Sequence, residues 1–247
     1  MPVSDSIEIH PTGPLKGTIR PPGSKSLTNR ALLCAALAEG PSQLNGALDS
    51  EDTQVMVAAL RQLGVRLDFD LEKRQIAVQG CAGRLPAAGG DLYVANSGTT
   101  VRFLAAMVTL GQGVFRLDGT PRMRERPIQD LLDALGQLGV QATSERGTGC
   151  PPIVISAAGL AGGRATVRGD VSSQFLSGLL LAAPYARAPV EIQVEGTLVS
   201  QPYIDMTLAV MAAFGVDVLH HEQKSFAVPR SPYRGRVYDI EPDASAA

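Results

Sequence analysis

Three amphipathic helical segments along the chain end in the same way. Each places apolar residues at the three- and four-residue spacing of one helix face, and each is followed by glycine and valine. The segments are residues 52–63, 128–138 and 204–214, and their closing glycines lie 75 and 76 residues apart. Glycine directly after a helix is a common stop signal because it adopts the left-handed backbone conformation without strain. The regular spacing indicates an internal repeat.

A second kind of helix begins upstream of each of these segments. Arg30, Arg102 and Gln174 each open a run of small and apolar residues, and they lie 72 residues apart. Small polar residues precede each run, as expected where a side chain caps a helix N-terminus. These residues are at 28–29, 98–100 and 172–173. The first of these helices is predicted at residues 31–38.

Short segments of β-branched or alternating character separate the helices. Strands are predicted at 17–20, 91–95 and 164–168, before the helices that Arg30, Arg102 and Gln174 open. Strands are also predicted at 114–117 and 190–194, before the amphipathic helices that end in glycine and valine. Hairpins are predicted at 65–69 with 75–79, at 140–143 with 153–156, and at 217–220 with 225–228. The unit reads β-α-β-α-β-β three times, and one unit is too small to bury a core alone. We predict an α/β fold in which the three units pack with pseudo-threefold symmetry, with one helix of each inside and the sheets outside.

Composition narrows the possible partners. The chain has 247 residues, of which 45% are hydrophobic, and a formal net charge of −2. A near-neutral protein with few aromatic residues lacks the basic surface that nucleic acid or an anionic membrane requires, and its apolar runs are shorter than the roughly 18 residues of a membrane span. The start of the chain shows no signal-peptide pattern, and three cysteines without CxxC spacing favour reduced thiols over disulfides or a zinc site. We therefore expect a cytoplasmic protein without nucleic-acid or membrane partners.

The segment 23–30, Gly-Ser-Lys-Ser-Leu-Thr-Asn-Arg, has the features of an anion-binding site. It precedes the first predicted helix, so free backbone N–H groups and the positive end of the helix dipole point toward it. Lys25 and Arg30 add full charges, and three hydroxyl side chains add hydrogen-bond donors. The alternative is an ordinary capped helix with two solvated cations, because a short motif of this kind also occurs by chance.

The internal repeat predicts that this segment shares a site with the corresponding segments of the other two units. If a pseudo-threefold axis relates the units, the N-termini of three similar helices converge, and Lys25, Gly98 and Ser172 surround one site. The helix dipole favours acidic side chains in a first turn by about 0.3–1 kcal/mol, whereas Lys25, Arg30 and Arg102 occupy the predicted first turns here. Cations placed against this preference indicate an anionic ligand, such as a phosphate or a carboxylate.

Five stretches, of which the first contains the segment 23–30, occur together in one order and spacing. They read PGSKSLTNR at 22–30, NSGTTVR at 96–102, GTPRMRERPI at 119–128, DVSSQF at 170–175 and SQPYID at 200–205. In combination they resemble the 5-enolpyruvylshikimate-3-phosphate synthase family, over about residues 10–243. The resemblance implies a transferase of the shikimate pathway that moves an enolpyruvyl group from phosphoenolpyruvate to shikimate 3-phosphate. It also implies an enzyme that needs no cofactor or metal and is a target of glyphosate.

The family fold implied by this resemblance has two similar domains, each of three βαβαββ units, with the active site between them. On that basis residues 21–229 form one substrate-binding domain, and residues 1–20 and 230–247 belong to the incomplete second domain. The missing C-terminal half would be a fused segment or a separate chain. Both ends of this chain are expected to be poorly anchored, because their sheet partners would lie in the absent domain.

By matching position, the resemblance assigns ten site residues. Lys25 would contact both substrates and take part in catalysis. Shikimate 3-phosphate would be held by Ser26, Arg30, Ser172, Ser173, Gln174, Ser200 and Tyr203, with the tyrosine packing along the shikimate ring. Gly98 and Arg122 would face phosphoenolpyruvate. Arginine suits phosphate and carboxylate because it binds either group through two hydrogen bonds, and glycine lets the backbone approach a ligand.

Several residues of these stretches have a plainer interpretation. Arg122 and Arg124 lie in a dense charge run, and such runs are usually solvated faces. Arg102 and Arg126 could equally brace loops by pairing with Asp or Glu. A lone tyrosine such as Tyr203 is more often a core residue than a ligand platform. Where the family often has a basic residue after the matching serine, this chain has glutamine at position 201, which would weaken the attraction for phosphate.

The family's proton-transfer groups fall outside this chain. Its general base aspartate, its acid-base glutamate and lysine, and several arginines for phosphoenolpyruvate would lie in the missing half, so the chain alone is expected to bind shikimate 3-phosphate without turning it over. A non-catalytic ligand-binding domain and one chain of a split enzyme remain alternatives. UDP-N-acetylglucosamine enolpyruvyl transferase is less favoured. That related family carries a cysteine in the loop that matches residues 121–126, and this chain has no cysteine between Cys81 and Cys150. A P-loop is excluded because residues 17–25 do not match its glycine spacing.

Overall fold

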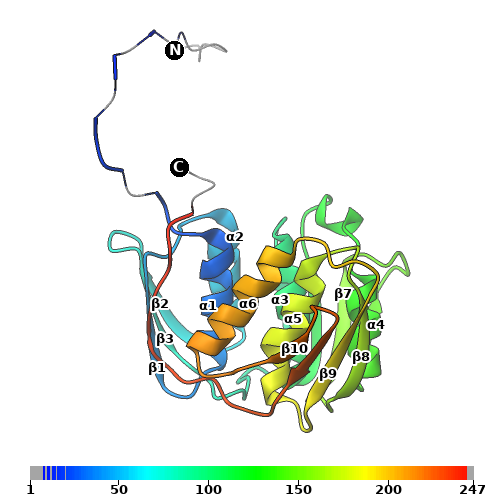
Figure 1. Ribbon diagram of the computed structural model, residues 1–247. Helices are drawn as coiled ribbons and strands as arrows, with labels where there is room; N and C mark the ends of the chain where they lie inside the picture. Colours follow the sequence, from blue (N-terminus) through cyan, green and yellow to red (C-terminus); the bar gives the residue numbers. More distant parts are fainter. Residues whose placement is uncertain (1–7, 9, 12, 15, 20, 244–247) are drawn as a thin grey trace.

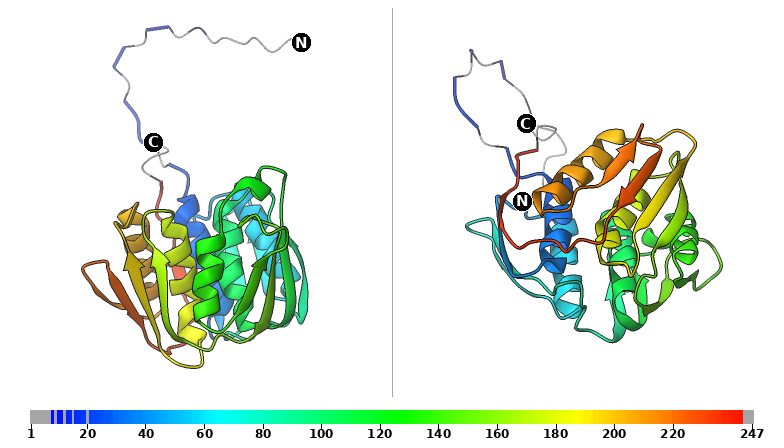
Figure 2. Two further views of the ribbon diagram at one scale, coloured as in Figure 1. Left: turned by 90° about the vertical axis from the view of Figure 1, so that its right-hand side faces the viewer. Right: turned by 60° about the horizontal axis from the view of Figure 1, so that its bottom comes forward.

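Three four-stranded sheets surround a group of packed helices (Figure 1, Figure 2). The arrangement is that of a computed structural model, which describes residues 8, 10, 11, 13, 14, 16–19 and 21–243. The first helices of the units are α1 (Lys25–Leu37), α3 (Gly98–Met107) and α5 (Ser173–Ala182). The second helices are α2 (Glu51–Gln62), α4 (Gln129–Gln137) and α6 (Gln201–Ala213). Nearly every residue of α1, α3 and α5 is buried, which confirms the predicted α/β architecture with one helix of each unit inside.

All three sheets have one topology, with the orders β12-β1-β3-β2, β4-β5-β7-β6 and β8-β9-β11-β10. The strands are β1 (Pro41–Asn45), β2 (Arg66–Asp70), β3 (Gln75–Gln79), β4 (Gly89–Tyr93), β5 (Gln112–Asp118), β6 (Gln141–Ser144), β7 (Ile153–Ala158), β8 (Gly163–Arg168), β9 (Val190–Glu195), β10 (Leu219–His221), β11 (Ser225–Val228) and β12 (Val237–Asp239). In each sheet the first two strands pair in parallel and the others pair antiparallel. The predicted βαβαββ order is therefore confirmed along the chain for the second and third units, and each predicted hairpin begins within two residues of its observed position.

The leading strand of the first unit comes from the far end of the chain. Strand β12 pairs in parallel with β1, in register from Gln43 with Val237 to Asn45 with Asp239, as β4 pairs with β5 and β8 with β9. The strand predicted at residues 17–20 is not observed, because residues 17–19 lie outside any strand and residue 20 falls outside the described residues. A sheet position that local sequence assigned to the N-terminus is thus filled by a segment more than 190 residues away.

Residues 230–243 pack onto this domain, which corrects the predicted limit at residue 229. Tyr233 is fully buried, and its hydroxyl donates to the Leu181 carbonyl at 3.0 Å. Gly23 and Pro242 form an antiparallel bridge, so the entering and leaving segments lie side by side. The expectation of a poorly anchored C-terminal segment is wrong for the described part, because its sheet partner β1 belongs to this domain. The assignment of residues 1–20 to a second domain stays a prediction.

Helix α1 begins at Lys25, six residues before the predicted start. The Ser24 hydroxyl accepts from the Leu27 N–H and caps the helix. Thr28, which was predicted as a cap, lies inside the helix and donates to the Ser24 carbonyl at 2.8 Å. The earlier start places Arg30 in the second turn, where only 2% of it is exposed. The predicted cap Ser172 is confirmed for α5, whereas α3 is capped by Ser97 and begins at Gly98, so residues 98–100, which were predicted as caps, lie inside that helix.

The central helices approach each other closely where α5 carries glycine. A Cβ atom on Gly178 would lie 2.8 Å from the backbone oxygen of Arg102 in α3. Glycine therefore lets the two helix backbones pack tightly, and this brings the N-termini of α3 and α5 to the same place. That juxtaposition forms part of the site described next.

Candidate anion-binding site

The N-termini of four helices, α1, α3, α5 and α6, meet at one pocket of about 430 Å³. It is lined by Lys25 and Ser26 of α1, Thr99 and Arg102 of α3, Ser173 and Gln174 of α5, Tyr203 of α6, and Arg126, Val171, Ser172, Val199 and Ser200 of the neighbouring loops. The predicted convergence of helix N-termini is confirmed. Seven of the ten predicted site residues line the pocket: Lys25, Ser26, Ser172, Ser173, Gln174, Ser200 and Tyr203. Their roles toward a ligand stay predictions.

Lys25 is the first residue of α1, and its ammonium group is half exposed at the pocket edge. Its Nζ lies 3.0 Å from Oδ2 of Asp52, which belongs to the first turn of α2. Asp52 does not line the pocket, so it holds the lysine from the side and leaves the other ammonium hydrogens available.

The start of α5 contributes a cluster of hydroxyl and amide groups. Ser172 caps the helix by accepting from the Gln174 backbone N–H at 3.2 Å. The Gln174 carboxamide lies between two residues of α3, because its Oε1 accepts from Arg102 Nη1 at 2.6 Å and its Nε2 donates to Thr99 Oγ1 at 3.1 Å. Two helices of different units are thus joined at the pocket wall.

The start of α6 differs from the other helix starts at the pocket. Ser200 occupies its N-cap position with φ of +57°, a left-handed conformation that costs a non-glycine residue free energy, and its side chain makes no capping hydrogen bond. Strain of this kind often marks a functional position. One turn later, Tyr203 is 45% exposed, so it is not the core aromatic residue of the plainer interpretation. Gln201 does not line the pocket.

Arg102 and Arg126 line the pocket, although both were given lesser weight from the sequence. Arg102 is 6% exposed and stacks on the Phe175 ring, 5.2 Å from its centroid. Burial, and then the nearby Arg126 cation, lower the pKa of Arg102 to about 10, so it stays charged at neutral pH. Arg126 Nη1 donates to the Asn96 carbonyl at 2.8 Å. Neither arginine pairs with Asp or Glu within the described residues, which excludes the predicted bracing by a carboxylate there.

The pocket therefore has a strongly one-sided charge. Lys25, Arg102 and Arg126 line it, and no Asp, Glu or His does. The positive ends of four helix dipoles add to the three cations. The signal for Arg102 was present in the sequence, as a cation in a predicted first turn. Arg126 had no such signal, because only the folded loop brings it beside α3.

Arg30 lies behind the pocket. All three of its guanidinium nitrogens donate to groups inside the protein: Nε to Thr207 Oγ1 at 2.7 Å, Nη1 to the Ser26 carbonyl at 3.0 Å, and Nη2 to Ser177 Oγ and the Tyr203 carbonyl at 3.2 Å. Burial lowers the pKa of Arg30 to about 10. Arg30 thus supports Ser26 and Tyr203, which do line the pocket. Arg30 is buried because α1 begins at Lys25, which places Arg30 in the second turn of the helix.

Gly98 and Arg122 also lie outside the pocket lining. Gly98 is the first residue of α3, directly beneath the guanidinium groups of Arg102 and Arg126. Arg122 is exposed and pairs with Glu125, as the solvated-face interpretation predicts. Arg124 differs from that interpretation: its Nε and Nη2 donate to Asp118 at 2.9 and 2.8 Å, so it braces the loop after β5.

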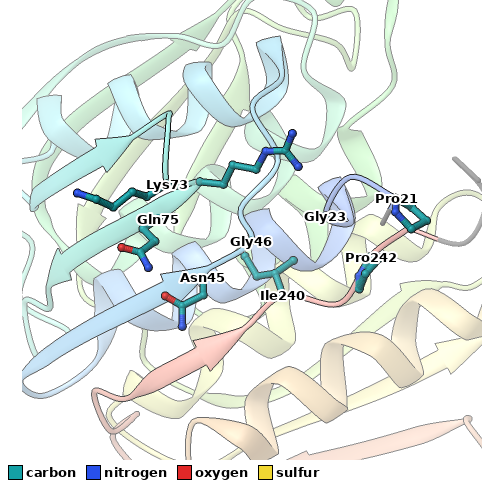
Figure 3. Close-up of a pocket in the computed structure, with 9 residues that line it drawn as sticks. Pro21, Gly23, Asn45, Gly46, Lys73, Gln75, Ile240 and Pro242 are labelled. Carbon is teal, nitrogen blue, oxygen red and sulfur yellow. The ribbon is translucent and has the colours of Figure 1, made fainter. Parts of the chain in front are cut away.

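Another hollow, of about 270 Å³, lies at the crossover segments, where Pro21, Gly23, Ile240 and Pro242 meet Gly46 and the β2–β3 turn (Figure 3). It has no converging helix N-termini. No group of three or more His, Cys, Asp or Glu that could hold a metal ion occurs among the described residues. Within the same residues, every helix is too short or too polar to cross a bilayer.

Comparison with known proteins gives one consistent result. A family model described as EPSP synthase (3-phosphoshikimate 1-carboxyvinyltransferase) matches residues 9–247. Proteins named 3-phosphoshikimate 1-carboxyvinyltransferase from Shewanella denitrificans and Shewanella pealeana are 48% and 47% identical to the chain over 245 and 247 residues. These matches cover 98% of the chain but only 57% and 58% of the two relatives. The chain therefore spans little more than half the length of the relatives it matches.

Solved structures show the same pattern. EPSP synthase from Acinetobacter baumannii superposes with a TM-score of 0.79 at 26% identity, covering 91% of this chain and 49% of that one. The enolpyruvyl transferase NikO from Streptomyces tendae superposes with a TM-score of 0.67 at 19% identity, covering 93% of this chain and 52% of that one. The second match shows a shared fold.

Proposed function

Because this chain belongs to the EPSP synthase family, we propose that it forms the shikimate 3-phosphate-binding part of a 3-phosphoshikimate 1-carboxyvinyltransferase. The observation that carries the proposal is the pocket with four helix N-termini, three cations and no acidic lining residue. A dianionic phosphate is the group that such a pocket binds best, because both the helix dipoles and the charged side chains favour it. The hydroxyl groups around it suit a polyhydroxylated ring.

We assign the phosphate of shikimate 3-phosphate to Ser172, Ser173 and Ser200, whose hydroxyl groups border the pocket. Tyr203 would pack along the ring, since its own ring is partly exposed there. Ser26 would contact the substrate directly. Arg30 would act through Ser26 and Tyr203, whose carbonyls it holds, and not by touching the ligand.

Phosphoenolpyruvate would bind at the side of the pocket where α3 begins. Lys25 would contact both substrates, whereas Gln174 would donate its amide N–H to shikimate 3-phosphate; both residues line the pocket. Gly98 lets Arg102 and Arg126 approach the α3 backbone, and Arg122 would reach this substrate by leaving Glu125. Fixed cations and N–H groups stabilise the charge that develops on phosphate and carboxylate during transfer.

The complete transfer reaction needs groups that this pocket does not contain. Proton transfer by a positioned acid or base typically contributes 10² to 10⁴-fold, and the lining residues offer no carboxylate or imidazole for it, only Lys25 and Tyr203. We therefore propose that the remainder of the protein, as found in the longer relatives, supplies the proton-transfer groups and closes over the substrates. A non-catalytic ligand-binding role stays the alternative, and the expected cytoplasmic location stays a prediction.

Calorimetric titration of the chain with shikimate 3-phosphate tests the proposal. We expect a dissociation constant between micromolar and millimolar, about 4–8 kcal/mol of binding, because an open half-site leaves the phosphate partly solvated. Lys25→Ala should weaken binding by about 1.5–3 kcal/mol, the range for a charge-assisted hydrogen bond. Lys73→Ala, at an exposed lysine of the β2–β3 turn, is the matched control and should have no effect. Absence of wild-type binding, or equal effects of both variants, would contradict the proposal.

A further inference from the structure

Arg102, which lines the pocket, holds the Gln174 carboxamide from the α3 side. Its Nη1 donates to Gln174 Oε1 at 2.6 Å, a short, charge-assisted bond, and its Nη2 donates to the Pro127 carbonyl at 3.2 Å. The guanidinium is also stacked on Phe175, and its Nε is buried without a hydrogen-bond partner among the described residues. With 6% of the residue exposed, most of its bonding capacity is directed at the protein.

The hydrogen bonds around Gln174 have a fixed direction. A guanidinium has donors only, so the carboxamide must turn its oxygen toward Arg102 and its nitrogen away. One N–H of the nitrogen goes to Thr99 Oγ1 at 3.1 Å, which leaves the other N–H for the pocket. Thr99 accepts this bond through its oxygen, so its own O–H proton is available to the pocket that it lines.

We propose that Arg102 is a positioning residue that fixes the orientation of the Gln174 carboxamide, so that Gln174 and Thr99 both donate hydrogen bonds into the pocket. In the reverse orientation the carboxamide would present an oxygen to the pocket, and an acceptor facing a phosphate or carboxylate is repelled. The inference rests on the proposed function, because the donors matter only if an anion binds. Their orientation, however, can be measured without any ligand.

The internal repeat supports a positioning role. Arg30, Arg102 and Gln174 recur at a spacing of 72 residues in the first helices of successive units, as the sixth, fifth and second residues of α1, α3 and α5. Arg30 lies 5.3 Å from the centroid of Phe103, as Arg102 lies 5.2 Å from that of Phe175. All three guanidinium nitrogens of Arg30 donate hydrogen bonds to groups behind the pocket, whereas one nitrogen of Arg102 donates to Gln174 at the pocket surface. The buried Arg102 of the second unit thus orients the half-buried Gln174 amide of the third.

A double-mutant cycle on the full chain distinguishes positioning from direct contact. Arg102→Met keeps the packing on Phe175 and removes the donor, and we expect it to weaken shikimate 3-phosphate binding about 10- to 100-fold, as should Gln174→Ala. The double variant should lose no more than either single variant, because Arg102 acts through Gln174. Losses that multiply would mean that Arg102 touches the ligand, and would overturn the proposal. Arg102→Lys, which also donates only, should restore part of the affinity.

Gln174→Glu tests the direction of the bonds. This variant keeps the shape of the side chain and its bond to Arg102, but it places an acceptor oxygen toward the pocket. We expect a larger loss of affinity than with Gln174→Ala and no loss of thermal stability. Affinity equal to wild type would overturn the proposal.

Amide NMR supplies a readout that needs no ligand. In the wild-type chain the two Nε2 protons of Gln174 should have chemical shifts unlike those of an exposed glutamine such as Gln112 and should exchange slowly with water, and in Arg102→Met they should move toward the Gln112 shifts. Unchanged resonances would overturn the proposal. If wild type binds no shikimate 3-phosphate while these resonances respond as expected, the proposed function fails and the positioning role of Arg102 stands.

Discussion

At the scale of single residues, Gly98 is where two guanidinium groups reach the backbone of α3. A Cβ atom there would lie 2.5 Å from Arg126 Nη2 and 2.8 Å from Arg102 Nη1. Both atoms end flexible side chains, so a methyl group would displace the cations and leave the helix intact. Gly98 thus matters for the site more than for the fold.

Gly98→Ala should therefore separate binding from stability. We expect the affinity for phosphoenolpyruvate or inorganic phosphate to fall about 10-fold or more, because the Arg126 cation shifts and Arg102 shifts together with the Gln174 carboxamide that it holds, while the thermal midpoint stays within a few degrees of wild type. Gly136→Ala in α4 is the matched control, since a Cβ there meets no atom within 4 Å. Calorimetry and thermal unfolding measure the two quantities, and a large fall in the midpoint of Gly98→Ala would show a structural role instead.

At the scale of elements, the loop between β5 and α4 carries Arg126 to the pocket, and Asp118 anchors it. This carboxylate accepts two hydrogen bonds from Arg124 and one from the Gly119 N–H at 2.8 Å, and it pairs with Arg116. The pKa of Asp118 lies below its ordinary value of 3.8, and the hydrogen bonds from Arg124 are the largest cause. Together with the short 3₁₀ helix Met123–Glu125, these contacts give the loop a defined shape.

The lowered pKa gives a pH-dependent prediction for Asp118→Asn. The unfolded chain takes up the proton at a higher pH than the folded chain does. Stabilisation by Asp118 is therefore complete above its ordinary pKa and is lost as pH falls through the lower folded-state value. Asp118→Asn should lower the thermal midpoint at pH 7, and the difference from wild type should shrink below about pH 4. A difference that stays constant from pH 7 to pH 3 would exclude a contribution from this carboxylate.

The C-terminal strand is an element of the same domain, held by Tyr233. This ring is fully buried, packs edge-on against Phe214 and donates its hydroxyl proton to α5 through the Leu181 carbonyl. Tyr233→Ala should cost about 3–5 kcal/mol of unfolding free energy, as for other large buried aromatic residues. Tyr93→Ala, at a 62% exposed tyrosine, is the control and should change stability by less than about 0.5 kcal/mol. Urea unfolding compares them, and equal effects would mean that β12 is not part of the cooperative unit.

At the scale of the whole molecule, the three units are alike in topology and unlike at the pocket. Each supplies one helix N-terminus from the interior, but only the third supplies a second one, from α6. The resulting half-site has three cations and no acidic lining residue, and Lys25 alone of the three pairs with a carboxylate, that of Asp52, among the described residues. A second domain with a complementary surface would exclude water from this half-site and strengthen every charged contact within it.

The chain alone should therefore bind without catalysing. We expect no multiple-turnover release of phosphate from phosphoenolpyruvate and shikimate 3-phosphate, and no measurable binding of glyphosate, which the family resemblance places between two domains. Adding the separately produced C-terminal remainder of the S. denitrificans relative should restore phosphate release if the two parts dock. Turnover by the 247 residues without that addition would show that proton-transfer groups exist within the chain itself.

The sequence by itself determined the features that depend on local signals. Helical periodicity, stop glycines and the 72- to 76-residue spacing predicted three βαβαββ units, and matching stretches predicted the family and most of the pocket lining. These signals are short in range, because a cap, a turn or an amphipathic face is specified by residues within one or two turns of each other.

Only the tertiary structure decided which cations face the pocket and which strand completes the first sheet. Arg30 and Arg102 look equivalent in the repeat, yet one is enclosed by Thr207 and Ser177 of other helices while the other reaches Gln174. Strand β12 joins β1 because a parallel neighbour fills the open edge of the sheet, and nothing near residue 237 in the sequence specifies that edge. Side-chain direction and strand partners depend on contacts between residues far apart in the chain, and local patterns do not encode them.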